Sequence, residues 1–393
     1  MAANALTYNA IGQLVTDIVQ QATGKQVIAP VNTSDFVAVA NVGLQAGYDN
    51  LMGAISQVLS RTVISNRPYT RKFQGLEADS IRWGNHVRKI NYIDRAWDDG
   101  SRLPITNGVS VDQQAPVLDD VVQTNFYGQN DYEIQWTMYA NQLDVAFRGP
   151  DEFASFISGK LQNISDMVEQ KHESLARMCL ANLVAGIYTL NNSSQIVHLL
   201  TEYNAATGIT PPLTATTVMQ PANFPGFIKW AYARIAAVSD MMTERSIIHH
   251  LNITGKEVNR HTPKSMQRVF MYAPSRHQVD ARVLADAFHD SYLYQSVNET
   301  VNFWQDITTP DSIDVVPTYM DATGALVTPM SHVQVSDIFA VIVDPEAIGY
   351  TVVNERSTSA PYNGKGEYQN FWLKFTDRYW NDFTENAVVF LLD

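Results

Sequence analysis

Few residues in this chain have the types and spacing that catalysis or metal binding requires. His172 and Glu173 begin the H-E-x-x-H pattern of zinc proteases, but Ala176 stands where the second histidine would have to be. The chain also lacks the G-x-S-x-G nucleophile elbow, the phosphate-binding P-loop and the G-x-G-x-x-G dinucleotide motif, and Gly364–Gly366 is typical of a turn. We therefore predict no catalytic residue and no cofactor.

Three further groups of residues have an ordinary structural explanation. His249 and His250 are adjacent, so their side chains point in different directions, and no cysteine or third histidine is near enough to favour a metal site. Asp98–Ser101 lacks the alternating acidic ligands of a calcium loop and is typical of a hairpin turn. Cys179, the only cysteine, cannot form an internal disulfide and lies on an apolar helical stripe. We predict a buried thiol and no bound metal.

Basic residues gather before residue 73, in a stretch without an acidic residue between Asp49 and Glu77. Such a cluster could contact nucleic acid or the carboxylates of a neighbouring chain. We favour a solvated surface patch, because charge runs usually form exposed faces. The cluster consists of Arg61, Arg67, Arg71 and Lys72.

The composition indicates a folded protein that assembles with others. The 393 residues correspond to about two to three domains, and 45% hydrophobic residues can form a sizeable core. A formal charge of −13 argues against a surface that binds nucleic acid all over. Only 17% of the residues are charged, against about 25% in ordinary domains, which favours a subunit covered by neighbours. With no basic leader and no long apolar run, neither secretion nor membrane insertion is expected.

The first 65 residues predict short amphipathic helices separated by hinges. Ile11, Leu14 and Ile18 share one helical face, and Gly24 is placed to end that helix. A second apolar pattern follows at Leu51–Leu59. These helices must bury their apolar faces either on the chain's own core or on another chain, and the sequence leaves both alternatives open.

Residues 66–130 predict a long two-stranded hairpin with an irregular tip. Ile81–Val87 and Tyr132–Met138 alternate between apolar and polar residues, as half-buried strands do. Turn residues lie between them, at Asp98–Gly100 and Asn107–Gly108. Because a hairpin of this length does not hold itself up in water, it must lie on the chain's own body or on a neighbour.

The strongest local signal is a long helix that starts at Pro150. Proline suits the first helical position, and the acidic pair Asp151–Glu152 complements the positive end of the helix dipole. Apolar residues then recur every three or four positions from Phe153 to Leu183, with one gap of seven across Lys171–His172. The pattern predicts one continuous helix over 150–188, about 58 Å long at 1.5 Å per residue. Such a helix is a scaffold element.

The rest of the chain predicts a mixed region followed by strands. Tyr203–Ile228 has no charged residue and four prolines, so we expect an irregular loop there, with a helix over Phe227–Met242 after it. Arg268–Pro274 predicts a buried strand that leads into a helix, and a hairpin is expected around Asp321–Gly324. The last predicted strands are Ile338–Val343, Tyr350–Val353, Tyr368–Phe375 and Ala387–Leu392.

The order of these elements resembles the Hong Kong 97-type fold of tailed-bacteriophage major capsid proteins. The stretches that carry the resemblance are VNTSDFVAVANVGLQAGYDNLMGAISQVLSRTVISNRPYTRKF (residues 31–73), DEFASFISGK at the start of the long helix, VFMYAPS, DIFAVIVDPEAIGYTVV and ENAVVFLLD. None is a diagnostic motif alone, but the ordered set covers most of the chain. The resemblance implies an α+β fold and a structural protein, not an enzyme, that self-assembles into the icosahedral shell enclosing phage genomic DNA.

The resemblance also implies how the chain divides. The mixed region would be the A-domain, at the contacts around the five- and six-fold axes of the shell. The implied parts are an N-terminal arm (1–65), an E-loop hairpin (66–130), a P-domain with the spine helix (131–189), an A-domain (190–335) and returning P-domain strands (336–393).

The implied partners are further copies of the chain, in hexamers and pentamers. A separate scaffolding protein is implied because no long charged helical extension precedes the arm, and a portal would accompany it. Packaged DNA would make only weak, non-specific contact with an acidic lining, and the virion capsid would assemble in the bacterial host cytoplasm without a membrane. Lys89 is a candidate for the covalent crosslink of some relatives, but nothing in the sequence places it.

We predict that the tip of the hairpin lies across an adjacent subunit. Trp97 offers an apolar surface there, and Asp98, Asp99 and Arg102 offer ion pairs, a mixture typical of interfaces. Two alternatives stay open at this point. One is an encapsulin nanocompartment shell, which uses the same fold, and the other is an α/β enzyme with a site at the turn Pro274–Arg276.

Overall fold

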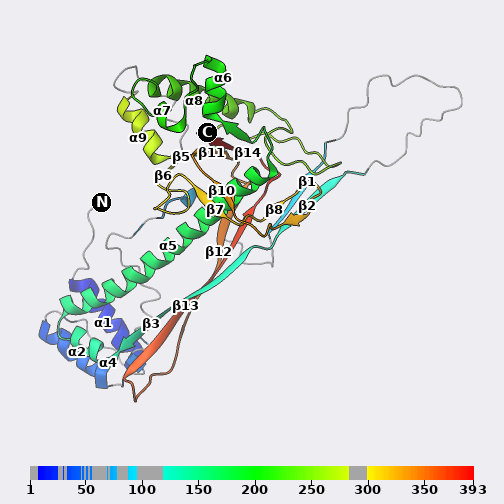
Figure 1. Cartoon of the computed structure of the whole chain (residues 1–393). Coiled ribbons are helices and arrows are strands. Elements are labelled where there is room, and N and C mark those ends of the chain that lie inside the picture. The colour runs from blue at the N-terminus through cyan, green and yellow to red at the C-terminus, as the bar shows by residue number, and fades with distance from the viewer. Residues whose placement is uncertain are drawn as a thin grey trace.

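The chain is elongated, and one helix runs along most of its length (Figure 1). The computed structural model describes residues 8–24, 30, 33–45, 47, 50–51, 54, 69, 71–77, 87–94, 118–282 and 299–393. The N-terminal helices lie at one end of the long helix, and a mixed sheet with its own helices lies at the other (Figure 1).

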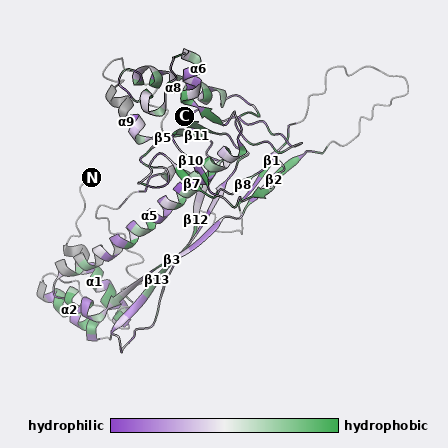
Figure 2. Ribbon diagram, in the orientation of Figure 1, coloured by the Kyte–Doolittle hydropathy of each residue, from purple (hydrophilic) through white to green (hydrophobic). Residues whose placement is uncertain are grey.

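The long helix, α5 (Pro150–Leu190), confirms the predicted continuous helix and extends it by two residues. Proline occupies its first turn, and Asn191 ends it in the left-handed conformation, with φ 50°. Phe153 and Leu183 are fully buried, and Ile164 and Val168 are half-buried. Figure 2 shows hydrophilic and hydrophobic residues alternating along this helix, as the three/four spacing requires.

A three-stranded antiparallel sheet of order β12-β13-β3 lies beneath α5. Its inner face carries aromatic cross-strand pairs: the Tyr132 and Phe375 rings stack at 5.1 Å, and those of Trp136 and Phe371 at 5.5 Å. This sheet gives the middle of the molecule its stiffness. Its strands are β3 (Gln129–Tyr139), β12 (Ile348–Ser359) and β13 (Tyr368–Asn381).

A five-stranded mixed sheet forms the other end of the molecule, in the order β4-β14-β11-β5-β6. One apolar cluster joins one face of this sheet to the C-terminal half of α5, and a second joins the other face to α6 (Leu199–Thr207) and α8 (Phe224–Met241). Its strands are β4 (Ile196–His198), β5 (Arg268–Tyr272), β6 (Glu299–Val301), β11 (Ile338–Val343) and β14 (Ala387–Leu391).

The four predicted C-terminal strands are all present, but they divide between the two sheets. Segment 336–393 was expected to return as P-domain strands, whereas only β12 and β13 pair with β3. The other two, β11 and β14, join the five-stranded sheet. The reason is their composition, because every residue of both strands is buried and a central strand covered on both faces suits such runs.

The prediction of an irregular loop over Tyr203–Ile228 is wrong at both of its ends. Helix α6 continues to Thr207, a short helix α7 covers Ala215–Val218, and α8 begins at Phe224. Uncharged side chains satisfy the backbone there: Thr214 and Thr217 form a capping box, and Asn204 bonds both backbone groups of Leu213. Absence of charge therefore did not mean absence of structure.

The remaining predictions in this region are confirmed. Strand β5 leads directly into α9 (Ala273–Arg282), and β8 (Tyr319–Met320) forms a short hairpin with β9 (Leu326–Val327). A further pair of short strands, β7 (Ile313–Val315) and β10 (Val333–Val335), packs beside α5.

The N-terminal helices pack on the chain's own core, one of the two alternatives left open. Helix α1 (Tyr8–Thr23) ends at Gly24, as predicted, and is followed by α2 (Thr33–Gln45). Phe36 of α2 packs against Phe153 at the start of α5, beside α4 (Ala140–Ala146). The predicted Leu51–Leu59 pattern lies mostly outside the described residues.

The described part of the predicted hairpin is an antiparallel ribbon of β1 (Val87–Tyr92) and β2 (Val121–Phe126). The alternating run Tyr132–Met138 is not part of this ribbon, because it lies in β3 and pairs with β13. Just before it, a single 3-10 turn, η1 (Gln74–Leu76), lies beside α5 and β12. None of the helices in the described part of the chain has both the length and the apolarity that crossing a bilayer requires.

Candidate functional site at the anchors of the extended segments

Tyr69 and residues 71–77, here called the strap, cross the middle of α5 and are held there by carboxylates. The backbone N–H of Tyr69 donates to Asp166 at 2.9 Å, and that of Phe73 donates to Glu299 at 2.6 Å. The Tyr69 hydroxyl donates to Glu173. Because these acceptors lie on both α5 and β6, the strap ties the long helix to the five-stranded sheet.

Phe73 fixes the strap in the core. Its backbone has a positive φ of 64°, which costs a residue with a side chain some free energy, so packing must compensate. The ring is 1% exposed, lies 5.5 Å from the Phe270 ring, and has the Arg177 guanidinium 4.9 Å from its centre. The packing of the Phe73 ring against Phe270 and Arg177 therefore holds the strap at one defined point of the core.

Arg71 corrects the prediction of a solvated basic patch. Its side chain is 11% exposed and pairs with Glu77 and with Glu169, the latter at 3.2 Å. It also donates to His172 Nδ1 at 2.7 Å. Arg71 is therefore an internal cation of the strap, whereas Arg61 and Arg67 lie outside the described residues.

The strap carboxylates differ in how strongly their charge is stabilised. Burial acts to raise the pKa of Glu173, but hydrogen bonds from Tyr69 and Arg177 outweigh it and lower that pKa. The hydrogen bond to Glu173 raises the pKa of Tyr69 to about 12. For Glu299, burial dominates and raises the pKa. Glu173 is thus the firmly ionised acceptor of the strap.

The base of the β1–β2 ribbon, here called the hairpin root, is anchored by a second group of charges. Lys89 Nζ lies 2.9 Å from Glu346, 3.1 Å from Asp382 and within hydrogen-bonding distance of Glu385. Arg260 pairs with the same Glu385 at 2.9 Å. Two cations from distant parts of the chain thus meet the turn between β13 and β14.

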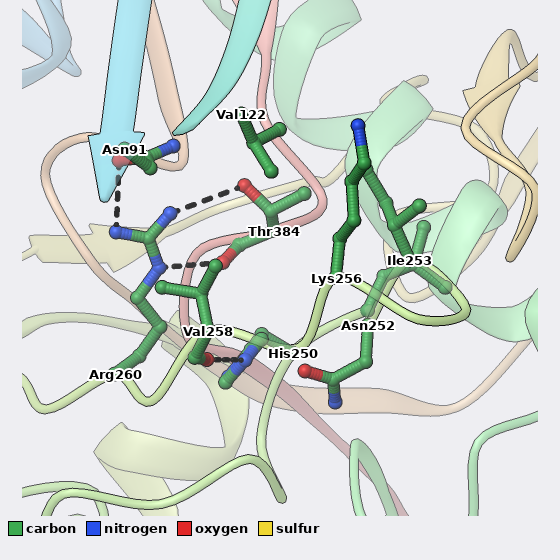
Figure 3. Close-up of a pocket in the computed structure, with 10 residues that line it drawn as sticks. Asn91, Val122, His250, Asn252, Ile253, Lys256, Val258, Arg260 and Thr384 are labelled. Atoms are coloured by element: carbon green, nitrogen blue, oxygen red, sulfur yellow. Dashed lines mark hydrogen bonds between the residues drawn. The ribbon is translucent and has the colours of Figure 1, made fainter. Parts of the chain in front are cut away.

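Arg260 also joins the root through neutral groups, as Figure 3 shows. Its guanidinium donates to Asn91 of β1 at 3.1 Å and to the Thr384 carbonyl at 3.0 Å. At the end of β1, Asp94 accepts from Arg245 at 2.6 Å and from Asn259 at 2.9 Å. The hydrogen bond from Asn259 contributes most to lowering the pKa of Asp94.

The buried pair at the root is not symmetrical. Burial raises the pKa of Glu385 to about 7, although Lys89 and Arg260 oppose the shift. For Lys89, burial acts to lower the pKa, but the attraction of Asp382 and Glu385 prevails and raises it. Lys89 therefore stays charged at neutral pH, whereas the raised pKa of Glu385 lies close to neutral pH.

A small cavity lies between the root and the body (Figure 3). Asn91 and Val122 line it from the ribbon, and His250, Arg260 and Thr384 line it from the body. Its volume is about 10 Å³, the room that one water molecule needs. It is therefore a packing defect of the joint and not a ligand site.

The two adjacent histidines make hydrogen bonds within the chain, and Cys179 is buried, as the sequence predicted for the thiol. His249 bonds the Ser194 carbonyl, and His250 bonds Asn386 and the Val258 carbonyl; burial lowers the pKa of both histidines. Cys179 is 1% exposed, and burial raises the pKa of its thiol to about 12, so it is a poor nucleophile. Within the described ranges, no three potential metal ligands come together.

The predicted contact residues of the hairpin tip, Trp97, Asp98, Asp99 and Arg102, lie outside the described residues. Sequence reasoning missed the anchors themselves. The sequence offered Lys89 only as a crosslink candidate and did not show what it contacts. Nothing in the sequence analysis pointed to the buried turn Asp382–Asn386. The available signal was the polar turn itself, because it directly precedes the apolar strand Ala387–Leu391.

A long helix across an antiparallel sheet, a mixed sheet at one end and an anchored extended ribbon define a shell-forming subunit of the Hong Kong 97-type fold. The chain belongs to the family of Phi29-like phage major capsid proteins, which matches residues 15–391. It is therefore a structural component of a phage capsid, which is built from many copies of the protein. Among the alternatives left open, this match selects the phage shell over the nanocompartment.

Two solved structures share the fold at low sequence identity. A chain in the capsid structure of Staphylococcus phage Andhra is 11% identical, with a TM-score of 0.54, and the match covers 84% of this chain and 87% of that one. A chain in the structure of the head fiber and inner core protein gp22 of native bacteriophage P68 is 10% identical, with a TM-score of 0.53 and the same coverage. No curated protein matches the chain.

Proposed function

We propose that the hairpin of residues 66–130 clasps the adjacent subunit of the capsid shell, with Trp97, Asp98, Asp99 and Arg102 at the contact. The observation that carries this proposal is the outer face of the β1–β2 ribbon. Tyr92 is 68% exposed, Ile90 is 50% exposed, and Val121, which lies opposite Tyr92, is 46% exposed. Large apolar side chains gathered on one face of a ribbon are typical of an interface.

The pairing of the ribbon supports this role. Tyr92 lies opposite Val121, so both side chains occupy the same outer face, while Lys89 and Asn91 point to the anchored inner face. Part of the ribbon is also coloured as hydrophobic in Figure 2. A two-stranded ribbon is marginal alone in water, so a partner surface on its outer face would order it.

The decisive experiment replaces residues 95–103 with a short Gly-Ser linker in the full chain. The expected variant keeps the thermal unfolding transition of the unassembled protein and fails to form closed shells in negative-stain images. A matched control replaces the Asn363–Gly366 turn, which is exposed and lies outside both the ribbon and the proposed A-domain, and this variant should still form shells. Shells at wild-type yield from the 95–103 variant would refute the clasp.

We also propose the finer division of the chain. The arm (1–65), the P-domain (131–189 with 336–393) and the A-domain (190–335) keep their predicted roles, except that β11 and β14 complete the A-domain sheet. The A-domain would form the contacts around the five- and six-fold axes of pentamers and hexamers. Its exposed surface supports this, because Gly208–Asn223 has no charged residue to desolvate at an interface.

The remaining proposals concern partners and place. The protein would act without catalysis, and a separate scaffolding protein and a portal would guide its assembly in the host cytoplasm. The formal charge of −13 supports only weak, non-specific contact with packaged DNA, because like charges repel. Copurification with scaffold and portal from an infected host would test the partners, and an empty result would count against them.

A further inference from the structure

We propose that the outer face of the three-stranded sheet, which points away from α5, receives the hairpin tip of a second copy of the chain. Asp98 and Asp99 of that tip pair with arginines of β12 and β13, and Trp97 packs beside them. The inference rests on the proposed clasp and adds the surface on which the clasp closes. Its support is a buried arginine without a partner, a matching pattern of side chains, and the chemistry of the opposite surface.

The strand register shows which side chains form this outer face. Phe375 of β13 points toward α5, because its ring contacts the His172 ring, with the two centroids 6.5 Å apart. Side chains alternate along a strand, so the residues on either side of Phe375 point away from α5. On β13 the outer face therefore carries Trp372, Lys374, Thr376 and Arg378, and beside Lys374 lie Arg356 of β12 and Glu133 of β3.

Arg378 is a cation on this face that has no counterion among the described residues. It is 7% exposed, and neither Nε nor Nη1 has a hydrogen-bond partner in the described part of the chain. An arginine stays charged at any ordinary pH, so its removal from water without an acceptor costs free energy. Thr351 and Gln129 lie beside it in the sheet, and neither brings a negative charge. A carboxylate from outside the subunit would supply the missing acceptor.

The outer face offers further groups for a charged partner. Arg356 is exposed and forms no hydrogen bond or ion pair with the described residues. Lys374 and Glu133 are each more than half exposed, and their charged atoms lie 3.5 Å apart, the loose pairing of a surface salt bridge. Trp372, two residues along β13 from Lys374, is half-buried and offers an aromatic surface.

These groups complement the residues of the tip. Tryptophan and arginine are enriched at the energetic centres of interfaces, and opposite charges determine which surfaces meet. In a chain with a formal charge of −13, a surface whose unpaired charges are positive is suited to bind another copy. The complementary pairs are Asp98 and Asp99 with Arg356 and Arg378, Trp97 with Trp372, and Arg102 with Glu133.

The exposed side of α5 could not bind the acids of the tip in this way. Its exposed side chains between residues 163 and 178 are all uncharged, namely Asn163, Ser165, Met167, Gln170, Ser174 and Met178. A carboxylate pressed against them would lose water without gaining a cation, which is unfavourable. The two surfaces thus differ in the charge that the tip requires.

Thiol crosslinking between two different variants tests the contact, because the native Cys179 is buried. Full-length Asp99→Cys and Arg356→Cys chains are mixed, assembled into shells and treated with a short bismaleimide, since a salt bridge spaces two residues more widely than a disulfide does. Crosslinked dimers should form in this mixture, and only in assembled material. They should be absent from each variant alone and from the control mixture of Asp99→Cys with Ser174→Cys, which lies on the exposed side of α5.

Assembled shells without such dimers would overturn the inference, and so would dimers with Ser174→Cys in place of Arg356→Cys. Failure of the clasp itself gives a different result. If the Gly-Ser replacement of residues 95–103 prevents assembly while Arg356→Cys captures no tip, the clasp stands and this surface is wrong.

If Arg356→Cys does not assemble, an exchange of charges decides. Arg356→Glu and Asp99→Lys should each lower the yield of shells at least about tenfold, because like charges then meet, and the double variant should recover most of the yield. A double variant no better than either single one would refute the contact.

Discussion

In the wild-type protein, Glu385 at the hairpin root should make the free energy of unfolding depend on pH. Replacing Glu385 with glutamine should remove this dependence. Glu385 has a pKa of about 7 in the folded chain, against an ordinary value of 4.5. A folded pKa above the unfolded one means that the folded state binds the proton more tightly. The stabilisation is therefore complete below pH 4.5 and is lost as the pH rises through 7.

The size of the effect follows from the same two values. Each unit of pKa difference corresponds to about 1.4 kcal/mol, so wild type should lose about 2 to 3 kcal/mol between pH 5 and pH 8. The side chain is 7% exposed, so solvent screening reduces this little. Lys89 does not contribute to the change, because its raised pKa keeps it charged throughout.

Urea unfolding of the unassembled protein at pH 5, 6, 7 and 8 measures this loss of stability. The quantity to compare is the free energy of unfolding of wild type minus that of Glu385→Gln at each pH, which should fall as the pH rises. Glu346→Gln is the matched control, since Glu346 contacts the same lysine but is 65% exposed. The difference for Glu346→Gln should stay flat. A flat or rising wild-type curve relative to Glu385→Gln would show that the lysine and arginine, not burial, control the root.

Further substitutions test the packing and the buried ion pairs. Leu183→Ala, in the fully buried half of α5, should lower the free energy of unfolding by about 2–5 kcal/mol in urea titrations. Gly186→Ala should lower the thermal midpoint, because a methyl group would lie 2.5 Å from the Phe383 ring, and an overpacking cost of about 1–3 kcal/mol exceeds a helix gain of about 1 kcal/mol. Lys89→Met should lower the free energy of unfolding by about 3–5 kcal/mol, because it leaves buried carboxylates without their lysine partner. Adding Glu385→Met should restore part of this loss. A double variant that is no more stable than Lys89→Met would contradict the pairing of Lys89 with Glu385.

The elements set by local spacing were predictable from the sequence. The helix from Pro150 was found because its apolar residues recur over about eight turns, and the terminal strands because they are short runs bounded by turns. Which sheet each strand joins was not predictable, since β11 and β12 follow one another in the chain and pair with different partners. Strand pairing depends on contacts between distant residues, and no single segment encodes them.

The anchors were out of reach for the same reason. Lys89 and Glu385 are separated by 296 positions, and Arg71 and Glu169 by 98. A lysine in a polar strand is ordinarily exposed, so nothing local marks Lys89 as buried. The tip residues Trp97–Arg102 stay a prediction, because they lie outside the described residues.

One sequence signal did mark the strap, namely the gap of seven in the apolar stripe of α5. Val168 and Leu175 lie on either side of it, and His172 occupies the stripe position between them. A helix that only needed a core would have an aliphatic residue there, since a buried polar side chain costs free energy unless it is bonded. His172 is bonded by Arg71, and Asp166, Glu169 and Glu173 recur at helical spacing beside it to receive the strap.

The two kinds of contact have different mechanical consequences. Apolar clusters hold the body together, and they weaken only when the packed side chains separate from one another. Hydrogen bonds and ion pairs add to the packing at the strap and the hairpin root, and those at the root depend on the charge of Glu385. The extended segments of the subunit are thus attached by charged groups in addition to apolar packing, whereas α5 and both sheets are held mainly by apolar packing.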